Sequence, residues 1–117
     1  MEPLKSTLTL VLILLTAILL IGCSKPTSES LDSFASCLNE NGAVMYGAYW
    51  CGHCQSQKEI FGTSFAKVNY VECTEDEQAC NDAGITGYPT WKFADGTSLP
   101  GAQQFSTLAG KTGCKMP

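Results

Sequence analysis

The residues from Met45 to Cys54 constrain the fold of this chain more than any other stretch. Met45 to Trp50 is an apolar, aromatic-rich run of strand character, and Cys51 and Cys54 follow it with two residues between them. We expect both cysteines in the first turn of a helix, where free N–H groups and the helix dipole favour an anion. A thiol placed there ionises readily, and the thiolate is the form that attacks disulfides. The pattern predicts thiol–disulfide exchange with Cys51 as nucleophile and Cys54 as resolving thiol.

His53 lies between the two cysteines. A partial positive charge there would stabilise the Cys51 thiolate and make the disulfide form more oxidising. The alternatives are an inert disulfide or half of a zinc site. A structural zinc site needs four ligands, whereas His53 is the only histidine and the sequence has no second Cys-x-x-Cys. Haem attachment requires a histidine after Cys54, and Gln55 stands there. We therefore expect neither a metal nor a cofactor.

The amino-acid composition limits the cellular compartment and the classes of partner that we expect for this chain. The chain has 117 residues, which is enough for one domain, and it carries a net charge of −4. It has no arginine and no cluster of lysines, so nucleic-acid binding is not expected. Seven cysteines in so short a chain indicate an oxidising, extracytoplasmic compartment, where disulfides persist.

The amino end supports an extracytoplasmic placement. Lys5 precedes an apolar run from Leu8 to Ile21, which is shorter than a membrane-spanning helix and fits the core of a signal peptide. The run ends before Cys23 in a pattern that resembles the bacterial lipobox, in which the cysteine is lipidated after cleavage. We expect residues 1–22 to be a lipoprotein signal peptide, 23–30 a flexible tether and 31–117 the folded domain. An uncleaved anchor or a plain secretory signal are the alternatives, and either leaves the domain outside the cytoplasm.

Hydrophobic periodicity and turn residues predict one α/β domain. We expect Ile60 and Phe61 to point into the core at the end of the cysteine-bearing helix, with Gly62 as its cap. Asp95-Gly96 is a hairpin signal. The expected elements, in order, are a helix that buries Leu31, Phe34, Ala35 and Leu38, a strand over 43–49, a helix over 52–61, a strand over 67–73, a helix over 75–83, strands over 90–93 and 97–99, and a helix that buries Phe105, Leu108 and Ala109. This order gives a four-stranded mixed sheet with helices on both faces, and an additional helix at its amino end.

The four remaining cysteines of the domain form an even set, which is Cys37, Cys73, Cys80 and Cys114. Four thiols allow three connectivities, and they could also stay free. Pairing Cys73 with Cys80 is the local choice, and it leaves Cys37 for Cys114. A capping box at Thr74 would begin a helix directly after Cys73 and hold the first pair too far apart. We therefore expect that helix to begin nearer to Glu77.

Trp50-Cys51-Gly52-His53-Cys54 and Tyr88-Pro89-Thr90 together resemble the thioredoxin superfamily, and the Cys-Gly-His-Cys tetrad is similar to that of protein disulfide isomerase domains. The resemblance implies a thioredoxin-like fold. It also implies a cis peptide bond before Pro89 beside the cysteine pair, in a segment with which an extended substrate pairs. Trp50, Gly52, Tyr88 and Pro89 would then line the substrate groove.

Phe34 to Gly113 resembles, more narrowly, the thioredoxin-like domain of bacterial vitamin K epoxide reductase homologues. The matching segments are Met45 to Cys51, Gln57 to Glu59, Asn69 to Cys73 and Gly84 to Trp91. The Cys51-to-Cys54 tetrad, the Tyr88-Pro89 segment and the lipobox together predict a membrane-anchored thiol–disulfide oxidoreductase, an oxidant or isomerase, that acts on exported proteins at the outer face of a bacterial membrane. We expect a monomer that cycles with a quinone-linked membrane oxidase of the same type, supplied by another chain.

This prediction has two alternatives, and the sequence departs from the family pattern at one position. The chain could instead be an extracytoplasmic thiol reductase, or a non-catalytic lipoprotein whose cysteine pair binds copper or zinc. Many thioredoxins carry a buried acid six residues before the first cysteine, and this chain has Met45 there. Proton transfer to and from Cys54 must then use water or another group, for which Glu59 and Lys58 are the candidates.

Overall fold

A four-stranded mixed sheet forms the centre of the fold, in the computed structural model that describes residues 2–17, 22 and 24–117. Its strand order is β2-β1-β3-β4, and the strands are β1 (Val44–Gly47), β2 (Asn69–Glu72), β3 (Thr90–Lys92) and β4 (Ser98–Pro100). β1 runs parallel to β2 and antiparallel to β3, which also pairs antiparallel with β4. The predicted α/β class and four-stranded mixed sheet are confirmed.

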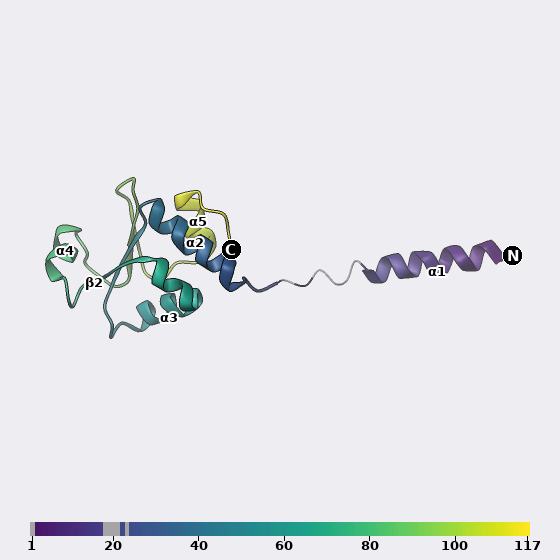
Figure 1. Cartoon of the computed structure of the whole chain (residues 1–117), viewed down its shortest axis with the longest axis horizontal. Coiled ribbons are helices and arrows are strands. Elements are labelled where there is room, and N and C mark those ends of the chain that lie inside the picture. Colours follow the sequence, from purple (N-terminus) through teal and green to yellow (C-terminus); the bar gives the residue numbers. More distant parts are fainter. Residues whose placement is uncertain (1, 18–21, 23) are drawn as a thin grey trace.

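From residue 28 onward, the helices follow the predicted order around this sheet (Figure 1). The described helices are α1 (Glu2–Ala17), α2 (Ser28–Glu40), α3 (Gly52–Phe61), α4 (Glu77–Asp82) and α5 (Phe105–Thr112). A 3₁₀ helix that the sequence did not predict, η2 (Gly62–Lys67), continues α3 beyond the Gly62 cap. Among the described residues, no helix combines the length and the apolar character needed to cross a membrane.

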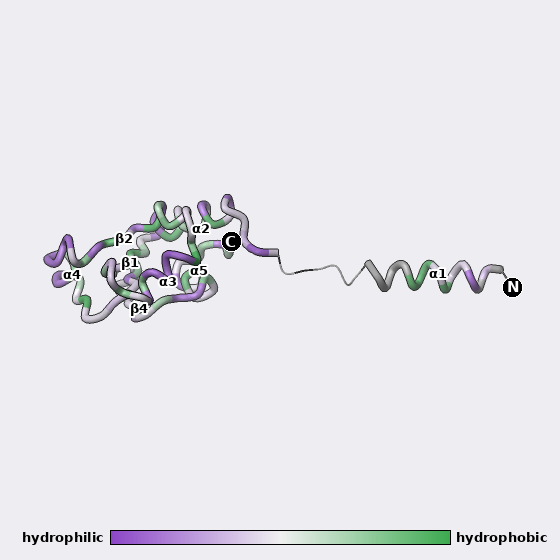
Figure 2. The backbone as a smooth tube through the Cα atoms, turned by 90° about the horizontal axis from the view of Figure 1, so that it is seen from below, coloured by the Kyte–Doolittle hydropathy of each residue, from purple (hydrophilic) through white to green (hydrophobic). Residues whose placement is uncertain are grey.

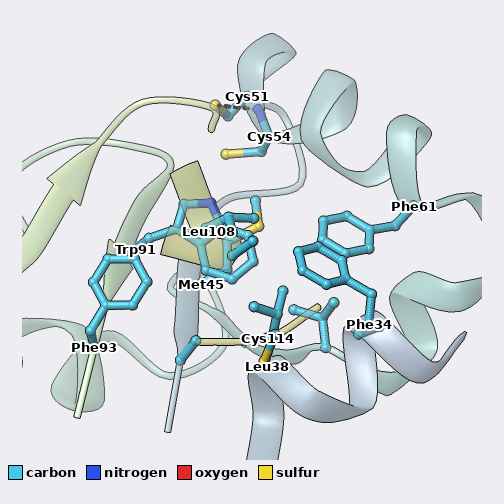
Figure 3. Packing of buried hydrophobic residues seen from close by; sticks show 14 of the residues in the cluster. Phe34, Leu38, Met45, Cys51, Cys54, Phe61, Trp91, Phe93, Leu108 and Cys114 are labelled. Carbon is cyan, nitrogen blue, oxygen red and sulfur yellow. Dashed lines mark hydrogen bonds between the residues drawn. The ribbon is translucent and has the colours of Figure 1, made fainter. Parts of the chain in front are cut away.

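The core lies on one face of the sheet. Met45 of β1 and Trp91 of β3 are directly paired in the register and are fully buried on this face. α2, α3 and α5 each contribute a phenylalanine, and the rings of Phe34, Phe61 and Phe105 contact one another with centroids 5.0–6.2 Å apart. Figure 3 shows these elements converging on the core. Burying a side chain of this size stabilises the fold by about 1.5–3 kcal/mol, so this cluster holds the three helices on the sheet.

α4 lies toward the opposite face. Lys92 follows Trp91 in β3 and therefore points away from the core, because successive strand residues alternate between faces. Its ammonium group donates to the carbonyl of Ala83, at the end of α4 (2.7 Å). Figure 2 shows that α4 is mostly hydrophilic, so it contributes little to the core.

The expected burial of Ile60 is wrong, and the capping box at Thr74, which the expected start of α4 near Glu77 had set aside, does not form. Ile60 is 46 % exposed, because the buried face of α3 runs through Cys54, Gln57 and Phe61, and position 60 lies off that line. Thr74 is not the cap of α4, because its hydroxyl donates to Glu72 instead (2.7 Å). The strands over 43–49 and 67–73 are also shorter than expected, since only 44–47 and 69–72 pair.

Asp76 caps α4 in place of Thr74, and its side chain accepts from the Ala79 N–H (3.0 Å). The helix therefore begins at Glu77, as expected from the need to keep Cys73 close to Cys80. At the other end of the domain, α5 ends at Gly113, whose φ of +74° is the left-handed conformation that favours glycine.

Candidate functional site

The cysteine pair lies where β1 turns into α3. β1 is central in the sheet, and the chain leaves it through buried Ala48 and the exposed residues Tyr49 and Trp50. The Cys51 N–H donates to the Ala48 carbonyl (3.1 Å), which closes the turn. α3 then begins at Gly52, so both cysteines lie at the start of a helix, in the place that the sequence indicated.

Cys51 is the N-cap residue of α3. Its backbone is extended, and its Sγ accepts a hydrogen bond from the Cys54 N–H (3.2 Å). This is the position that a serine or aspartate oxygen occupies in many helices, and it places the sulfur against the positive end of the helix dipole. Both cysteines are free thiols in this structure. A negative charge that forms on Cys51 Sγ is therefore stabilised by a backbone donor and by the dipole.

Cys54 lies deeper than Cys51. Its side chain is fully buried, whereas Cys51 keeps 7 % of its surface exposed at the outer edge of the site (Figure 3). Burial, together with the hydrogen bond to Cys51, raises the pKa of the Cys54 thiol to about 11. At neutral pH Cys54 is thus held as a thiol, and only Cys51 is in a position to meet a partner first.

Trp50 and Tyr88 connect the cysteine turn to the segment before β3. Trp50 is 62 % exposed, so it is not a core residue, and its ring stacks edge-on against Tyr88 with centroids 5.8 Å apart. The peptide bond between Tyr88 and Pro89 is cis. Pro89 itself is buried, and its carbonyl accepts from the Gly101 N–H (2.7 Å). The two segments that the resemblance named therefore lie together.

His53 and Gly52 are exposed in the first turn of α3. His53 is close to the cysteines in sequence and open to solvent, so it is available to a partner that approaches Cys51. Glu59, one candidate for handling the Cys54 proton, is also exposed, while Lys58 is half-buried. Met45, at the position where many thioredoxins carry a buried acid, is fully buried in the core.

Behind Cys54, Tyr70 of β2 approaches the same glycine as the Cys54 sulfur. A Cβ atom on Gly47 would lie 2.9 Å from Cys54 Sγ and 3.2 Å from the Tyr70 hydroxyl oxygen. Any side chain at position 47 would therefore displace one of these groups. The sequence interpretation did not identify Tyr70 or its partner Glu72 as part of the site. The sequence signal that could have linked Tyr70 and Glu72 is their spacing of two residues, which places both side chains on the same face of a strand.

Gln57 is a second residue that the sequence interpretation missed. It is 1 % exposed, and its amide oxygen accepts from the Trp91 indole N–H (3.0 Å) and the Gln103 N–H (2.6 Å). Its amide nitrogen donates to the Gln103 carbonyl (3.1 Å). Gln57 thus fixes α3 to β3 and to the segment that precedes α5. Its spacing of three residues from Cys54 was the available signal.

The other four cysteines form two disulfides. Cys73 is bonded to Cys80 and Cys37 to Cys114, with Cα atoms 5.7 and 5.9 Å apart. This connectivity is the one that the spacing favoured. The second disulfide joins α2 to the residues after α5 and closes most of the domain into a loop.

Cys23, the expected lipidation site, lies outside the described residues. Over the part of the chain that the structure describes, no cluster of three or more histidine, cysteine or acidic side chains is arranged to hold a metal ion. A groove of about 460 Å³ runs along α2, and its lining includes Thr27, Cys37 and Met116. It is separate from the cysteine pair.

Comparison with known proteins gives matches to curated relatives, to solved structures and to a family model. The chain is 44 % identical over 99 residues to the thiol-disulfide oxidoreductase LTO1 of Arabidopsis thaliana, a match that covers 77 % of this chain and 26 % of the relative. It is 37 % identical over 90 residues to a protein disulfide-isomerase of Aspergillus niger, covering 66 % of this chain and 18 % of the relative. The chain therefore spans about a quarter or less of these relatives.

The X-ray structure of Fasciola hepatica thioredoxin matches with 26 % identity and a TM-score of 0.48, covering 67 % of this chain and 88 % of that one. The family model for thioredoxin matches residues 25–111, which include α2, the whole sheet and the cysteine pair. Because the family model matches most of the chain, the chain belongs to the thioredoxin family.

Proposed function

We propose that this chain is a thiol–disulfide oxidoreductase that exchanges disulfides with proteins through Cys51 and Cys54. The observation that carries the proposal is the position of Cys51 Sγ, at the cap of α3 and hydrogen-bonded to the Cys54 N–H. The relatives named thiol-disulfide oxidoreductase and protein disulfide-isomerase support the same activity.

The exchange proceeds in two steps. In the oxidising direction, a substrate thiolate attacks Cys51 of the Cys51–Cys54 disulfide, and Cys54 leaves as a thiolate that takes up a proton. A second substrate thiolate then attacks its own sulfur in the mixed disulfide and releases Cys51. Two electrons pass from the substrate dithiol to the cysteine pair. In the reducing direction the same steps run backwards, with Cys54 attacking Cys51 in the mixed disulfide.

The substrate lies along the surface made by Trp50 and Tyr88, next to the segment that contains the buried Pro89. Trp50 and Tyr88 present aromatic surface beside Cys51, and Tyr49 next to Trp50 is 67 % exposed. Exposed aromatic side chains in contact with each other are typical of binding surfaces. An extended, partly apolar segment around a substrate cysteine fits this surface.

The direction of exchange is that of an oxidant or isomerase. The tetrad from Cys51 to Cys54 contains His53, whose charge would stabilise the reduced pair through the Cys51 thiolate. The similarity to protein disulfide-isomerases over most of the domain points the same way. A reduction potential near that of thioredoxin, about −270 mV, would instead favour the reductase alternative.

The proposed location is the outer face of a bacterial membrane. The apolar run before Cys23 supports cleavage and lipidation there, and the two disulfides fit an oxidising compartment. The clients would then be exported proteins. The resemblance to the domain of vitamin K epoxide reductase homologues supports a quinone-linked membrane oxidase of that type as the redox partner.

The test is to trap mixed disulfides in cells with Cys54→Ala, which removes the resolving thiol. We expect covalent complexes with exported proteins and with the membrane oxidase, and their loss in the double variant with Cys51→Ser. Disulfide exchange that persists in Cys51→Ser alone would contradict the proposal. Radiolabelled lipid incorporation that is abolished by Cys23→Ala would test the anchor separately.

A further inference from the structure

Cys54 needs a route for its proton. It acts as thiolate in one step and as thiol in the resting site, yet its side chain is fully buried. The titratable groups that act on it are Cys51 and Lys58 on α3 and Tyr70 on β2, and Tyr70 in turn contacts Glu72. Cys51 is bonded to the substrate when Cys54 must lose its proton, so it cannot accept that proton.

Tyr70 is the group that reaches Cys54 from the sheet. Cys54 Sγ and the Tyr70 hydroxyl oxygen lie 2.9 and 3.2 Å from the point where a Cβ on Gly47 would be. The two atoms are therefore at most about 6 Å apart, a distance that one bridging water spans. Because Gly47 has no side chain, the Cys54 sulfur and the Tyr70 hydroxyl can both lie next to this position of β1.

The Tyr70 hydroxyl is oriented by Glu72. It donates its only hydrogen to Glu72 Oε2 (2.6 Å), so its oxygen lone pairs are left to accept a proton from the side of Cys54. Glu72 Oε1 is held in turn by the Tyr49 N–H (3.1 Å) and the Thr74 hydroxyl (2.7 Å). Glu72 is half-buried, next to exposed Tyr49 and Thr74, so it connects the site to solvent.

Lys58 supplies the positive charge for this arrangement. Its ammonium group lies 4.0 Å from the centroid of the Tyr70 ring, one turn of α3 after Cys54. A cation there favours the Cys54 thiolate and acts against its burial. Lys58 therefore stabilises the product of proton loss, while Tyr70 and Glu72 provide the path.

We propose that Tyr70 relays the proton between Cys54 and Glu72. When Cys54 attacks the mixed disulfide, its S–H bond breaks and the proton passes, through one water, to the Tyr70 oxygen. Tyr70 gives its own hydroxyl proton to Glu72, which releases it to solvent. The Cys54 thiolate then forms the bond to Cys51 Sγ, and the substrate sulfur leaves with the electron pair. In the opposite direction Glu72 returns a proton to the leaving Cys54.

The relay rests on the proposed function, and one experiment separates the two. Reduced protein is mixed with an aromatic disulfide that releases a coloured thiolate, 5,5′-dithiobis(2-nitrobenzoate). The first equivalent of thiolate reports attack by Cys51, and the second reports attack by Cys54 on the mixed disulfide. We expect Tyr70→Phe to leave the first phase unchanged and to slow the second by about 10²-fold at neutral pH, as for loss of a proton-transfer group.

The pH profile distinguishes a relay from a packing effect. With the relay, the second phase changes little between about pH 6 and pH 8. In Tyr70→Phe, deprotonation by bulk water is left, so the rate should rise about tenfold per pH unit, in proportion to the thiolate fraction. Glu72→Gln should produce the same profile. Tyr46→Phe removes a hydroxyl from the opposite face of the sheet and should match the wild type.

Equal second phases in the wild type and Tyr70→Phe, or parallel pH profiles, would overturn the relay while leaving the proposed function intact. An absent first phase in the wild type would overturn both. Unfolding midpoints of the three variants show that each rate belongs to folded protein.

Discussion

Gln57 offers the sharpest test of how α3 is held in place. Gln57→Met keeps the length and volume of the side chain but removes the amide. The Trp91 indole N–H and the Gln103 N–H then lose their acceptor, and the Gln103 carbonyl loses a donor. The perturbation therefore leaves polar groups unpaired without opening a cavity.

The expected loss of stability follows from the burial of these polar groups. A buried donor without a partner costs about 1–3 kcal/mol. Trp91 is fully buried and Gln103 is half-buried, so water can relieve part of the second cost. We expect Gln57→Met to lower the free energy of unfolding by about 3 kcal/mol, or the melting temperature by roughly 12–24 °C for a domain of this size.

Urea unfolding of the oxidised protein measures this loss, with Gln104→Met as the control because Gln104 is exposed. A double-mutant cycle with Trp91→Phe isolates the indole bond, since Trp91→Phe removes the orphaned donor. Gln57→Met should cost about 1–2 kcal/mol less in that background. A loss below about 1 kcal/mol in the wild-type background, or an equal loss in both, would refute the reasoning.

Three further predictions concern the rest of the domain. Gly47→Ala places a methyl group 2.9 Å from Cys54 Sγ, so we expect overpacking of about 1–3 kcal/mol in unfolding experiments, together with slower attack by Cys54. Replacing Cys37 and Cys114 together by alanine opens a loop of about 78 residues and should cost about 4.5 kcal/mol, more than loss of the short-loop disulfide, which the same unfolding assay compares. Burial raises the pKa of the Glu72 carboxyl, but its hydrogen bonds outweigh burial and lower it. The stability that Glu72 contributes is therefore present above about pH 4.5 and lost as pH falls below it, and an acid titration of unfolding should be flatter for Glu72→Gln.

The bounds of α3 could be predicted from the sequence because local signals agree there. An apolar strand ends at Trp50, and Gly62 stops the helix ten residues after it starts. The same agreement places Cys51 at the cap. Local patterns failed where a side chain had two possible partners: Thr74 could cap α4 but binds Glu72 instead.

The parts of the site that could not be predicted depend on contacts between distant segments. Tyr70 reaches Cys54 only because β2 lies parallel to β1 with Gly47 opposite Glu72, a register that no local pattern specifies. Gln57 is polar, and a polar helix residue is ordinarily assigned to the solvent face. Its burial depends on the indole of Trp91, which is 34 residues away in the chain.

The disulfide between Cys37 and Cys114 also marks one end of the domain. Cys114 lies at the end of the core remote from Cys51 and Cys54 (Figure 3). Thr27, just before α2, and Met116, near the last residue, line one groove beside this disulfide. Both ends of the folded unit therefore emerge at the same pole. A protein attached to a surface through either end would hold Cys51 on the side away from that surface. A partner could then reach Cys51 without contact with the point of attachment.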